Sequence, residues 1–325
     1  MENEKIIRKE QTRERLLRLA PVMGLILLFA VFMAIAVIRD INIPYSFKNI
    51  INQSVIVVVG ATGAVFIYTL GSFDISLGAS LCVSALLGAM AYNRSGSLLV
   101  MLLTCVGVAV LISLISSVLA SVFNLPVFVT TIAMLSLLNA LALVLIGANG
   151  TGDVIQVPAA AVRGINNVWV KLAVMLIYLG FCVFMFNYTK LGRHEKFQGG
   201  NPVCAKLTGL NGKRLAIAAF AIAGIGVGLG AFLTITYAPT LSRNTASSVG
   251  MDIIISIVFG GMPVSGGARS RIWSAAIGAV SMTLLNQIML TLSLDSGIGQ
   301  MVKALIFILV VFISMSNNKG NILPR

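Results

Sequence analysis

Between two long apolar runs lies the stretch LGRHEKFQGGNPVCAKLTGL, residues 191–210. Its only acid is Glu195, whereas its basic residues, counted with the flanks, are Lys190, Arg193, Lys196, Lys206, Lys213 and Arg214. Short loops that are rich in Lys and Arg lie on the cytoplasmic side of a membrane. Pro202 is suited to open a helix and Gly209 to close one. The stretch therefore predicts a cytoplasmic loop that carries a short amphipathic helix parallel to the membrane.

Composition sets the fold class. The chain has 325 residues, of which 58% are hydrophobic and 10% charged, with a mean hydropathy of +0.99. Soluble globular proteins carry about 25% charged residues, so we expect an all-α integral membrane protein. A β-barrel would show alternation in segments of about ten residues instead of long apolar runs. The net charge of +13 fits a positive cytoplasmic face and anionic lipid, and we expect no nucleic acid partner.

The sequence lacks the residue patterns of a catalytic or metal centre. Its four cysteines form no CxxC pair and His194 is its one histidine, which gives little support to a zinc site or a disulfide framework. No GxxxxGK[ST], HExxH, GxSxG or paired-carboxylate arrangement occurs. We therefore expect no catalytic residue, no metal and no cofactor on this chain, which is not predicted to be an enzyme. Any energy for transport must come from a partner or an ion gradient.

Ten apolar runs predict ten membrane crossings. Most are near the length of about 20 residues that a spanning helix needs, but one is much shorter. The first could instead be a signal peptide, because Ala34-Ile35-Ala36 resembles a cleavage site; the long leader, which holds four acids, favours an uncleaved helix. The runs are Pro21–Ile38, Phe47–Leu70, the run ending at Tyr92, Leu98–Val122, Pro126–Ile146, Trp169–Tyr188, Arg214–Tyr237, Met251–Gly261, Ile272–Leu292 and Met301–Met315.

The distribution of basic residues orients these crossings. With both termini inside, 16 of the 23 Lys and Arg fall in cytoplasmic segments and 7, among them Lys303, fall outside. We therefore predict one transmembrane domain over residues 1–325. Its cytoplasmic parts are an N-terminal segment (1–20), the loop (189–213) and a tail (317–325).

Two glycine-rich segments interrupt the apolar runs: GSFDISLG at 71–78 and GGMPVSGG at 260–267. Non-helical backbone inside a bilayer is tolerated only against protein or a water-filled cavity. The breaks, each flanked by spans over 47–90 and 248–289, also suggest a parallel pseudo-repeat. Their glycines are Gly71, Gly78, Gly260, Gly261, Gly266 and Gly267. Elsewhere the GxxxG spacings from Gly224 to Gly230 predict close helix packing.

Polar residues within the apolar runs are candidates to line a solute path. Asp74 is costly in a membrane, and it could instead cap the helix that follows it. The other polar candidates could equally form interhelical hydrogen bonds. The predicted pathway residues are Asn52, Gln53, Asp74, Thr130, Thr131, Asn139, Asn286 and Gln287.

Together, these segments resemble the ribose-type permeases of sugar ABC importers. The stretch 199–210 is similar to that family's coupling loop, with Val203 in place of an acid and Cys204 in place of Ala. Segment 71–78 is similar to GGIDLSVG, with Ser72 in place of Gly, and segment 260–267 to GGTSLSGG. Residues 125–131 resemble the family's pre-helix segment, whereas 268–274 depart from the pattern.

The resemblance implies a function and partners. It implies a bacterial inner-membrane permease for a monosaccharide or similar small polar solute. The partners would be a second permease copy or paralogue, a cytoplasmic ATPase that binds ATP and Mg, and an external binding protein. A nucleoside or furanone permease and an ion-gradient transporter stay open as alternatives, whereas an intramembrane enzyme is disfavoured because no catalytic set of residues occurs. The implied ATPase-coupling residues are Gly199, Gly200, Asn201, Cys204, Ala205, Lys206 and Gly209.

Overall fold

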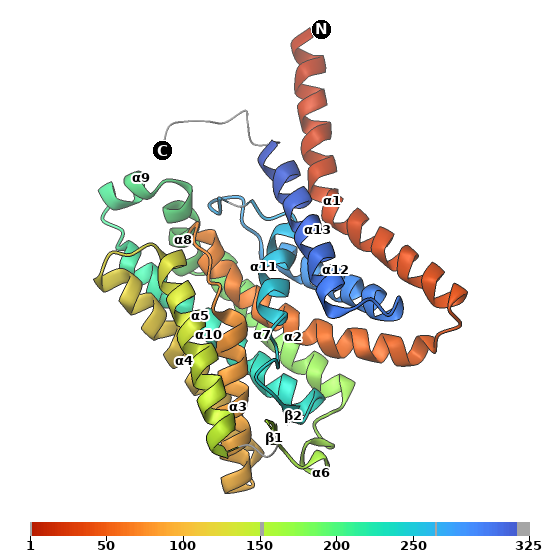
Figure 1. Ribbon diagram of the computed structural model, residues 1–325. Helices are drawn as coiled ribbons and strands as arrows, with labels where there is room; N and C mark the ends of the chain where they lie inside the picture. The colour runs from red at the N-terminus through yellow and green to blue at the C-terminus, as the bar shows by residue number, and fades with distance from the viewer. Residues whose placement is uncertain (1, 150–152, 264, 317–325) are drawn as a thin grey trace.

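The computed structural model describes residues 2–149, 153–263 and 265–316 and shows a helical bundle with one small sheet (Figure 1). Helices α8 and α9 lie at the same end of the bundle as the start of α1, and β1, β2 and α6 lie at the opposite end. The described elements are α1 (Glu2–Ile38), α2 (Ile43–Thr69), α3 (Leu77–Ser95), α4 (Leu98–Val122), α5 (Val127–Asn149), β1 (Ile155–Gln156), α6 (Ala159–Val162), α7 (Val168–Tyr188), α8 (Lys190–Gly200), α9 (Pro202–Leu207), α10 (Gly212–Tyr237), β2 (Thr240–Leu241), α11 (Val249–Phe259), α12 (Ile272–Thr291) and α13 (Ser296–Ser316).

The apolar runs form the helices that the sequence predicts. Among the described residues, seven helices are long and apolar enough to cross a membrane: Leu19–Ile38 of α1, α2, α4, Val127–Ala148 of α5, α7, α10 and α12. Helix α11 and the Gly297–Phe312 part of α13 are shorter apolar helices. The protein is therefore an all-α membrane protein, while the ten crossings and the pseudo-repeat stay predictions. The tail 317–325 lies outside the described residues.

The segment between α5 and α7 contains two short elements. Strand β1 pairs antiparallel with β2, with Ile155 opposite Leu241, and Asn93 Nδ2 donates to the Gln156 carbonyl at 2.9 Å. One-turn α6 follows β1. Two residues are too few to show the alternation from which a strand is predicted, so no local pattern predicts this pairing.

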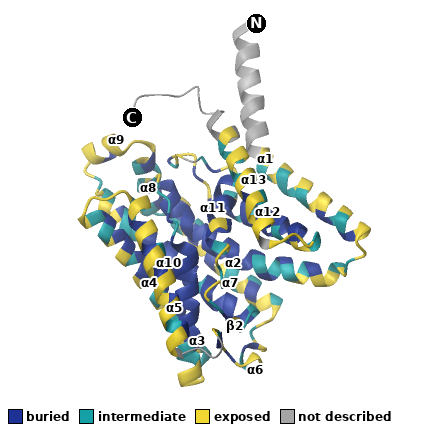
Figure 2. Cartoon of the chain, viewed as in Figure 1, coloured by how far each residue is buried: buried dark blue, intermediate teal, exposed yellow. Residues whose placement is uncertain are grey.

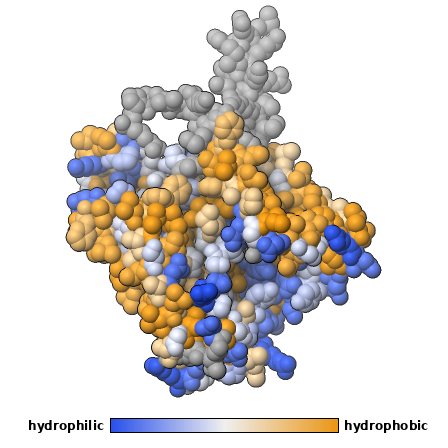
Figure 3. All heavy atoms as spheres, in the orientation of Figure 1, coloured by the Kyte–Doolittle hydropathy of each residue, from blue (hydrophilic) through white to orange (hydrophobic). Residues whose placement is uncertain are grey.

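The core surrounds α2 and α10. In the apolar part of α2, 89% of the residues are buried, whereas in that of α1 only 11% are buried. Helix α2 is therefore central and α1 peripheral (Figure 2). The outer face shown in Figure 3 carries broad apolar areas, as expected for a surface that meets lipid.

Glycines allow α10 to occupy the centre. A Cβ added at Gly228 would lie 2.4 Å from the Val106 Cα of α4, and one at Gly226 would lie 2.8 Å from the Val59 carbonyl oxygen of α2. Helix α10 therefore packs on α4 and α2 at backbone distance, which confirms the close packing predicted from its GxxxG spacings.

Candidate functional site

Helix α8 turns one face of small and acidic residues toward the bundle. Its buried residues are Gly192, Glu195 and Gly199, which helical periodicity places on one side. A Cβ at Gly192 would lie 2.1 Å from the Phe186 carbonyl oxygen at the end of α7. One at Gly199 would lie 1.8 Å from the Thr69 carbonyl oxygen at the end of α2. Only glycine permits this approach of α8 to both helix ends.

The loop and the two glycine breaks meet at one place. The backbone N–H of Gly267 donates to the Thr69 carbonyl at 2.9 Å, and a Cβ on Gly267 would lie 3.1 Å from Gly200 Cα. A Cβ on Gly266 would lie 2.4 Å from the Tyr68 carbonyl oxygen. Three segments that are distant in the sequence thus touch through their backbones. We call the set Gly71, Gly199, Gly200, Gly266 and Gly267 the glycine junction.

Backbone conformation adds a second requirement for glycine. Gly71, Gly266 and Gly267 have φ values of +75°, +67° and +88°, a region that side-chain-bearing residues rarely adopt. Gly261, before them in the same break, has φ +84°. The breaks are therefore defined turns, whose conformation an alanine would strain.

A second backbone contact lies deeper in the bundle, where α3 and α11 begin. A Cβ on Gly78 would lie 2.9 Å from the backbone nitrogen of Gly250, and one on Gly250 would lie 2.8 Å from that of Gly78. At the other end of α11, a Cβ on Gly260 would lie 1.7 Å from the Ser274 carbonyl oxygen of α12. Helix α11 therefore connects the region of the glycine junction to the first turn of α3.

Asp74 makes a local backbone contact. Its Oδ1 accepts from the backbone N–H of Ser76 at 2.8 Å and from the Ser76 hydroxyl at 2.6 Å. This is an Asx turn, two residues ahead of the N-cap position Ser76, whose own side chain makes no cap bond. The carboxylate thus fixes the turn that leads into α3, and it does not itself cap the helix as the cap interpretation predicts.

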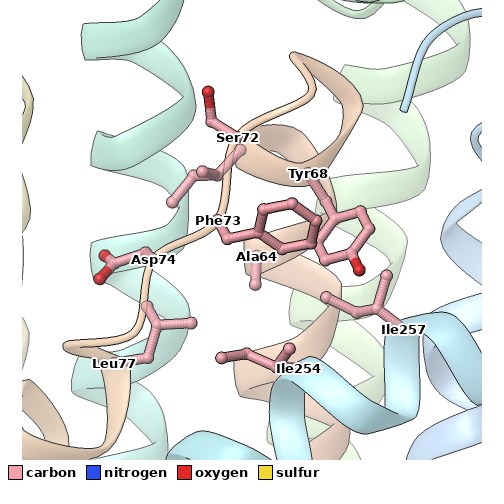
Figure 4. A pocket seen from close by; sticks show the side chains of 9 residues that line it. Ala64, Tyr68, Ser72, Phe73, Asp74, Leu77, Ile254 and Ile257 are labelled. Atoms are coloured by element: carbon pink, nitrogen blue, oxygen red, sulfur yellow. The ribbon is translucent and has the colours of Figure 1, made fainter. Parts of the chain in front are cut away.

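A small cavity lies beside this turn (Figure 4). Phe73 packs edge-on against Tyr68 with ring centroids 4.5 Å apart, and Ile254 of α11 reaches toward them. The Asp74 side chain is turned away from the two rings. The cavity is lined mainly by apolar residues: Ala64, Ile67, Tyr68, Ser72, Phe73, Asp74, Leu77, Ile254 and Ile257. An apolar cavity of this kind is typical of helix packing and is not a polar solute site.

Helix α9 begins and ends as the sequence predicts. Asn201 Oδ1 accepts from the Cys204 N–H at 3.0 Å, Pro202 opens the helix, and Gly209 follows it with φ +82°. Ala205, expected to meet a partner, is instead fully buried, because so short a helix holds to the bundle by its one inward side chain.

The outer face of the loop is apolar. Val203 and Leu207 of α9 are 65% and 82% exposed, and Phe197 of α8 is 44% exposed. Cys204 and Lys206 are also exposed. Val203 and Leu207 are four residues apart and therefore neighbours on one helical face. Exposed apolar side chains that gather in this way mark a protein or membrane contact, and we call Phe197, Val203 and Leu207 the docking patch.

Glu195 is a buried acid without a partner. It is fully buried, and neither carboxylate oxygen accepts a hydrogen bond from the described residues. Burial raises the pKa of Glu195 to about 9, against a smaller lowering by Lys196. Lys196 itself lies 4.2 Å from the centroid of the Phe186 ring. The Glu195 side chain is therefore neutral at pH 7.

The polar residues predicted to line a path are dispersed. Asn52 Oδ1 accepts from Lys171 Nζ at 2.8 Å, and Asn286 Nδ2 donates to Asp252 Oδ2 at 2.8 Å. Thr131 bonds the Phe128 carbonyl of its own helix. The remainder are Gln53, half-buried; Thr130 and Gln287, buried with a side-chain oxygen unpaired among the described residues; and Asn139, exposed.

Sequence reasoning missed one buried ionic cluster. Lys303 lies within α13 and is almost fully buried, with its Nζ 2.7 Å from Asp252 Oδ1. The assignment of Lys303 to an outside segment is therefore wrong. The sequence could not show this, because the partner acid lies on another helix and the run that contains Lys303 is short for a span. The available signal was Asp252, an acid in the short apolar run of α11. Among the described residues, no group of three or more His, Cys, Asp and Glu could hold a metal ion.

The chain is similar to known permeases along most of its length. A family model described as "branched-chain amino acid transport system / permease component" matches residues 46–314. The ribose import permease protein RbsC of Escherichia coli (strain K12) is 23% identical over 307 residues, covering 88% of this chain and 92% of that protein. RbsC of Haemophilus influenzae is 22% identical over 302 residues, covering 87% and 90%.

A higher identity extends over a shorter region. The xylose transport system permease protein XylH of Haemophilus influenzae is 32% identical over 157 residues, covering 48% of this chain and 41% of that protein. No solved structure matches the chain.

Proposed function

Because this chain belongs to the family of permease components of branched-chain amino acid transport systems, we propose that it is the membrane subunit of an ABC importer for a monosaccharide or similar small polar solute. A separate cytoplasmic ATPase, which binds ATP and Mg, supplies the energy. A second permease copy or paralogue completes the path, and an external binding protein delivers the solute. Two of the relatives are named as ribose and xylose permeases.

The glycine junction carries this proposal. A loop that only connected two spans would have no reason to touch the end of α2 and the second break through backbone atoms. Gly199 abuts the end of α2, and Gly267 bonds the same Thr69 carbonyl. A push on α8 is therefore transmitted to the end of α2, which leads toward α3, and to the segment that follows α11. Close-packed interiors transmit such displacements because they have little room to absorb them.

The docking patch is the proposed contact with the ATPase. Leu207→Glu places a charge on an 82% exposed position, so the chain should fold while the ATPase no longer binds. Arg193→Ala, at an exposed position of α8, is the matched control. Co-purification of the ATPase and substrate-stimulated ATP hydrolysis measure the effect. An ATPase that binds and responds equally to Leu207→Glu would show that the docking element lies elsewhere.

Uptake in proteoliposomes tests the function as a whole. The chain, reconstituted with its ATPase and binding protein, should accumulate a radiolabelled solute only with Mg-ATP. The panel contains ribose, xylose and galactose, together with a branched-chain amino acid because of the family description. Uptake by this chain alone under a proton or sodium gradient would overturn the proposal in favour of a secondary transporter.

The proposed topology is one transmembrane domain over 1–325, with ten crossings and both termini in the cytoplasm of a bacterial inner membrane. Segments 1–20, 189–213 and 317–325 then face the cytoplasm. Exposed Cys204 provides a native probe of the loop, and Gly164→Cys marks the opposite end. In cells, a membrane-impermeant maleimide should label Gly164→Cys and reach Cys204 only after permeabilisation. Labelling of Cys204 from outside would contradict this orientation.

A further inference from the structure

The buried cluster of Asp252, Asn286 and Lys303 joins three helices. Lys303 Nζ of α13 lies 2.7 Å from Asp252 Oδ1, and Asn286 Nδ2 of α12 donates to Asp252 Oδ2 at 2.8 Å. Asp252 and Lys303 are 2% and 9% exposed. Both carboxylate oxygens of Asp252 are thus occupied by α12 and α13. The carboxylate holds the first turn of α11 between these two helices.

The same turn of α11 makes the deep contacts with the rest of the bundle. Gly250, two residues before Asp252, abuts Gly78 of α3. A Cβ added at Gly60 of α2 would lie 2.5 Å from Ile253 Cδ1, the residue after Asp252. One turn of helix is therefore held by α2, α3, α12 and α13 together. A small rotation of this turn would alter the contact between Gly78 and Gly250.

The opposite end of α11 leads to the glycine junction. Gly260 abuts the Ser274 backbone, and the chain then turns to Gly266 and Gly267, which touch α2 and α8. Displacement of α8 is therefore passed to α11 at this end. The response at the other end depends on what fixes the first turn, and the ion pair of Asp252 with Lys303 is one fixed point there.

A buried ion pair can fix the position of a helix without adding to the stability of the protein. Two charges taken out of water lose hydration that their attraction barely repays, so apolar residues of similar size often stabilise a protein as well. Such a pair imposes a specific geometry, because a charge that leaves its partner stays buried without compensation. Asp252 also sits in the first helical turn, where the helix dipole favours an acid.

We propose that Lys303 and Asn286 are positioning residues that hold the first turn of α11 through Asp252 and so control the opening of the contact between Gly78 and Gly250. The role in transport rests on the function proposed above. The opening itself can be measured on this chain alone.

Cys82 provides the probe. It lies one turn after Gly78 on α3 and is 4% exposed, with its Sγ 3.8 Å from the Ser242 carbonyl oxygen in the segment that leads to α11. With Cys105, Cys182 and Cys204 replaced by Ala, the rate of reaction with N-ethylmaleimide reports how often this region opens.

Two variants distinguish positioning from folding. Lys303→Met leaves the Asp252 carboxylate buried without its countercharge, bonded only by Asn286, so the thermal midpoint should fall and Cys82 should react faster. A triple variant, Asp252→Leu with Asn286→Leu and Lys303→Met, replaces the whole cluster with apolar side chains. It should recover the wild-type midpoint to within a few degrees, yet Cys82 should react roughly tenfold faster than in wild type, because the local contact is no longer fixed.

The control, Ser281→Ala, removes a buried hydroxyl of α12 whose hydrogen bond among the described residues is to the Ile277 carbonyl of its own helix, and it should leave the Cys82 rate unchanged. A triple variant with the wild-type Cys82 rate would overturn the proposal. So would a triple variant as unstable as Lys303→Met, because the cluster would then serve folding alone. Failure of wild-type uptake would refute the proposed function and leave the Cys82 result standing.

Discussion

At the scale of single residues, Asp74 acts through one oxygen atom. Its Oδ1 accepts both bonds from Ser76, and the side-chain oxygen of Asn can accept the same two. Asp74→Asn should therefore keep at least about half of the transport rate, since Asn forms such turns and caps about as well as Asp. Asp74→Leu removes the acceptor and should lose most of it. Uptake assays of both variants at matched membrane levels measure this. Equal loss in both would mean that the charge itself is required.

Glu195 makes stability depend on pH in an uncommon direction. The pKa of Glu195 is raised by burial to about 9 in the folded chain, from an ordinary 4.5. Between these values the unfolded chain has lost this proton while the folded chain keeps it. The free energy of unfolding therefore falls as pH rises through this window, by up to about 1.4 kcal/mol per pH unit, and levels off above pH 9.

Glu195→Gln removes this titration while keeping the size and neutral state of the side chain. Thermal midpoints in detergent, measured from pH 5 to pH 9, should therefore fall more steeply for wild type than for the variant. The gap between the two curves isolates Glu195 from other titrating groups. Parallel curves would indicate that the carboxylate is already ionised and paired in the folded chain.

At the scale of elements, α8 owes its position to glycines. A Cβ at Gly199 would overlap the Thr69 carbonyl, a backbone atom that cannot rotate away. Gly199→Ala should therefore displace α8 and reduce substrate-stimulated ATP hydrolysis at least about tenfold, with a stability loss within the usual 0.5–3 kcal/mol for point mutations.

The matched control is Gly180→Ala, at a helical glycine of α7 where an added Cβ meets nothing within 4 Å. It should keep wild-type coupling and stability, or gain slightly, because Ala favours a helix. A fully coupled Gly199→Ala would show that the contact of α8 with α2 is dispensable.

Sequence reasoning predicted individual elements well and their contacts poorly. The bounds of α4 agree with the predicted run, and α9 begins at Pro202 as expected, because hydropathy, proline and glycine act locally. The β1–β2 pair and the ion pair of Asp252 with Lys303 depend on partners 86 and 51 residues away. Such partners leave no local pattern, and neither does the inward orientation of Ala205 on a six-residue helix.

At the scale of the whole molecule, the glycine segments identified in the sequence are connected by one continuous series of backbone contacts. The docking patch belongs to the same loop as the glycine junction, the junction touches both breaks, and α11 connects it to α3. Their sequence patterns showed that each break needed protein or water around it. The patterns did not show that the two breaks contact each other and α8, because these contacts depend on how the helices pack.

These contacts predict that ATP binding or hydrolysis by the partner ATPase changes the accessibility of Cys82. The most direct measurement is the rate at which Cys82, as the only cysteine of this chain, reacts with N-ethylmaleimide in the complex with its ATPase, with and without Mg-ATP. Mg-ATP should change this rate several-fold in wild type, by shifting the population in which the contact between Gly78 and Gly250 is open. In Leu207→Glu the rate should be the same with and without Mg-ATP. A wild-type complex that transports solute while Cys82 reacts at the same rate with and without Mg-ATP would contradict coupling through α8 and α11.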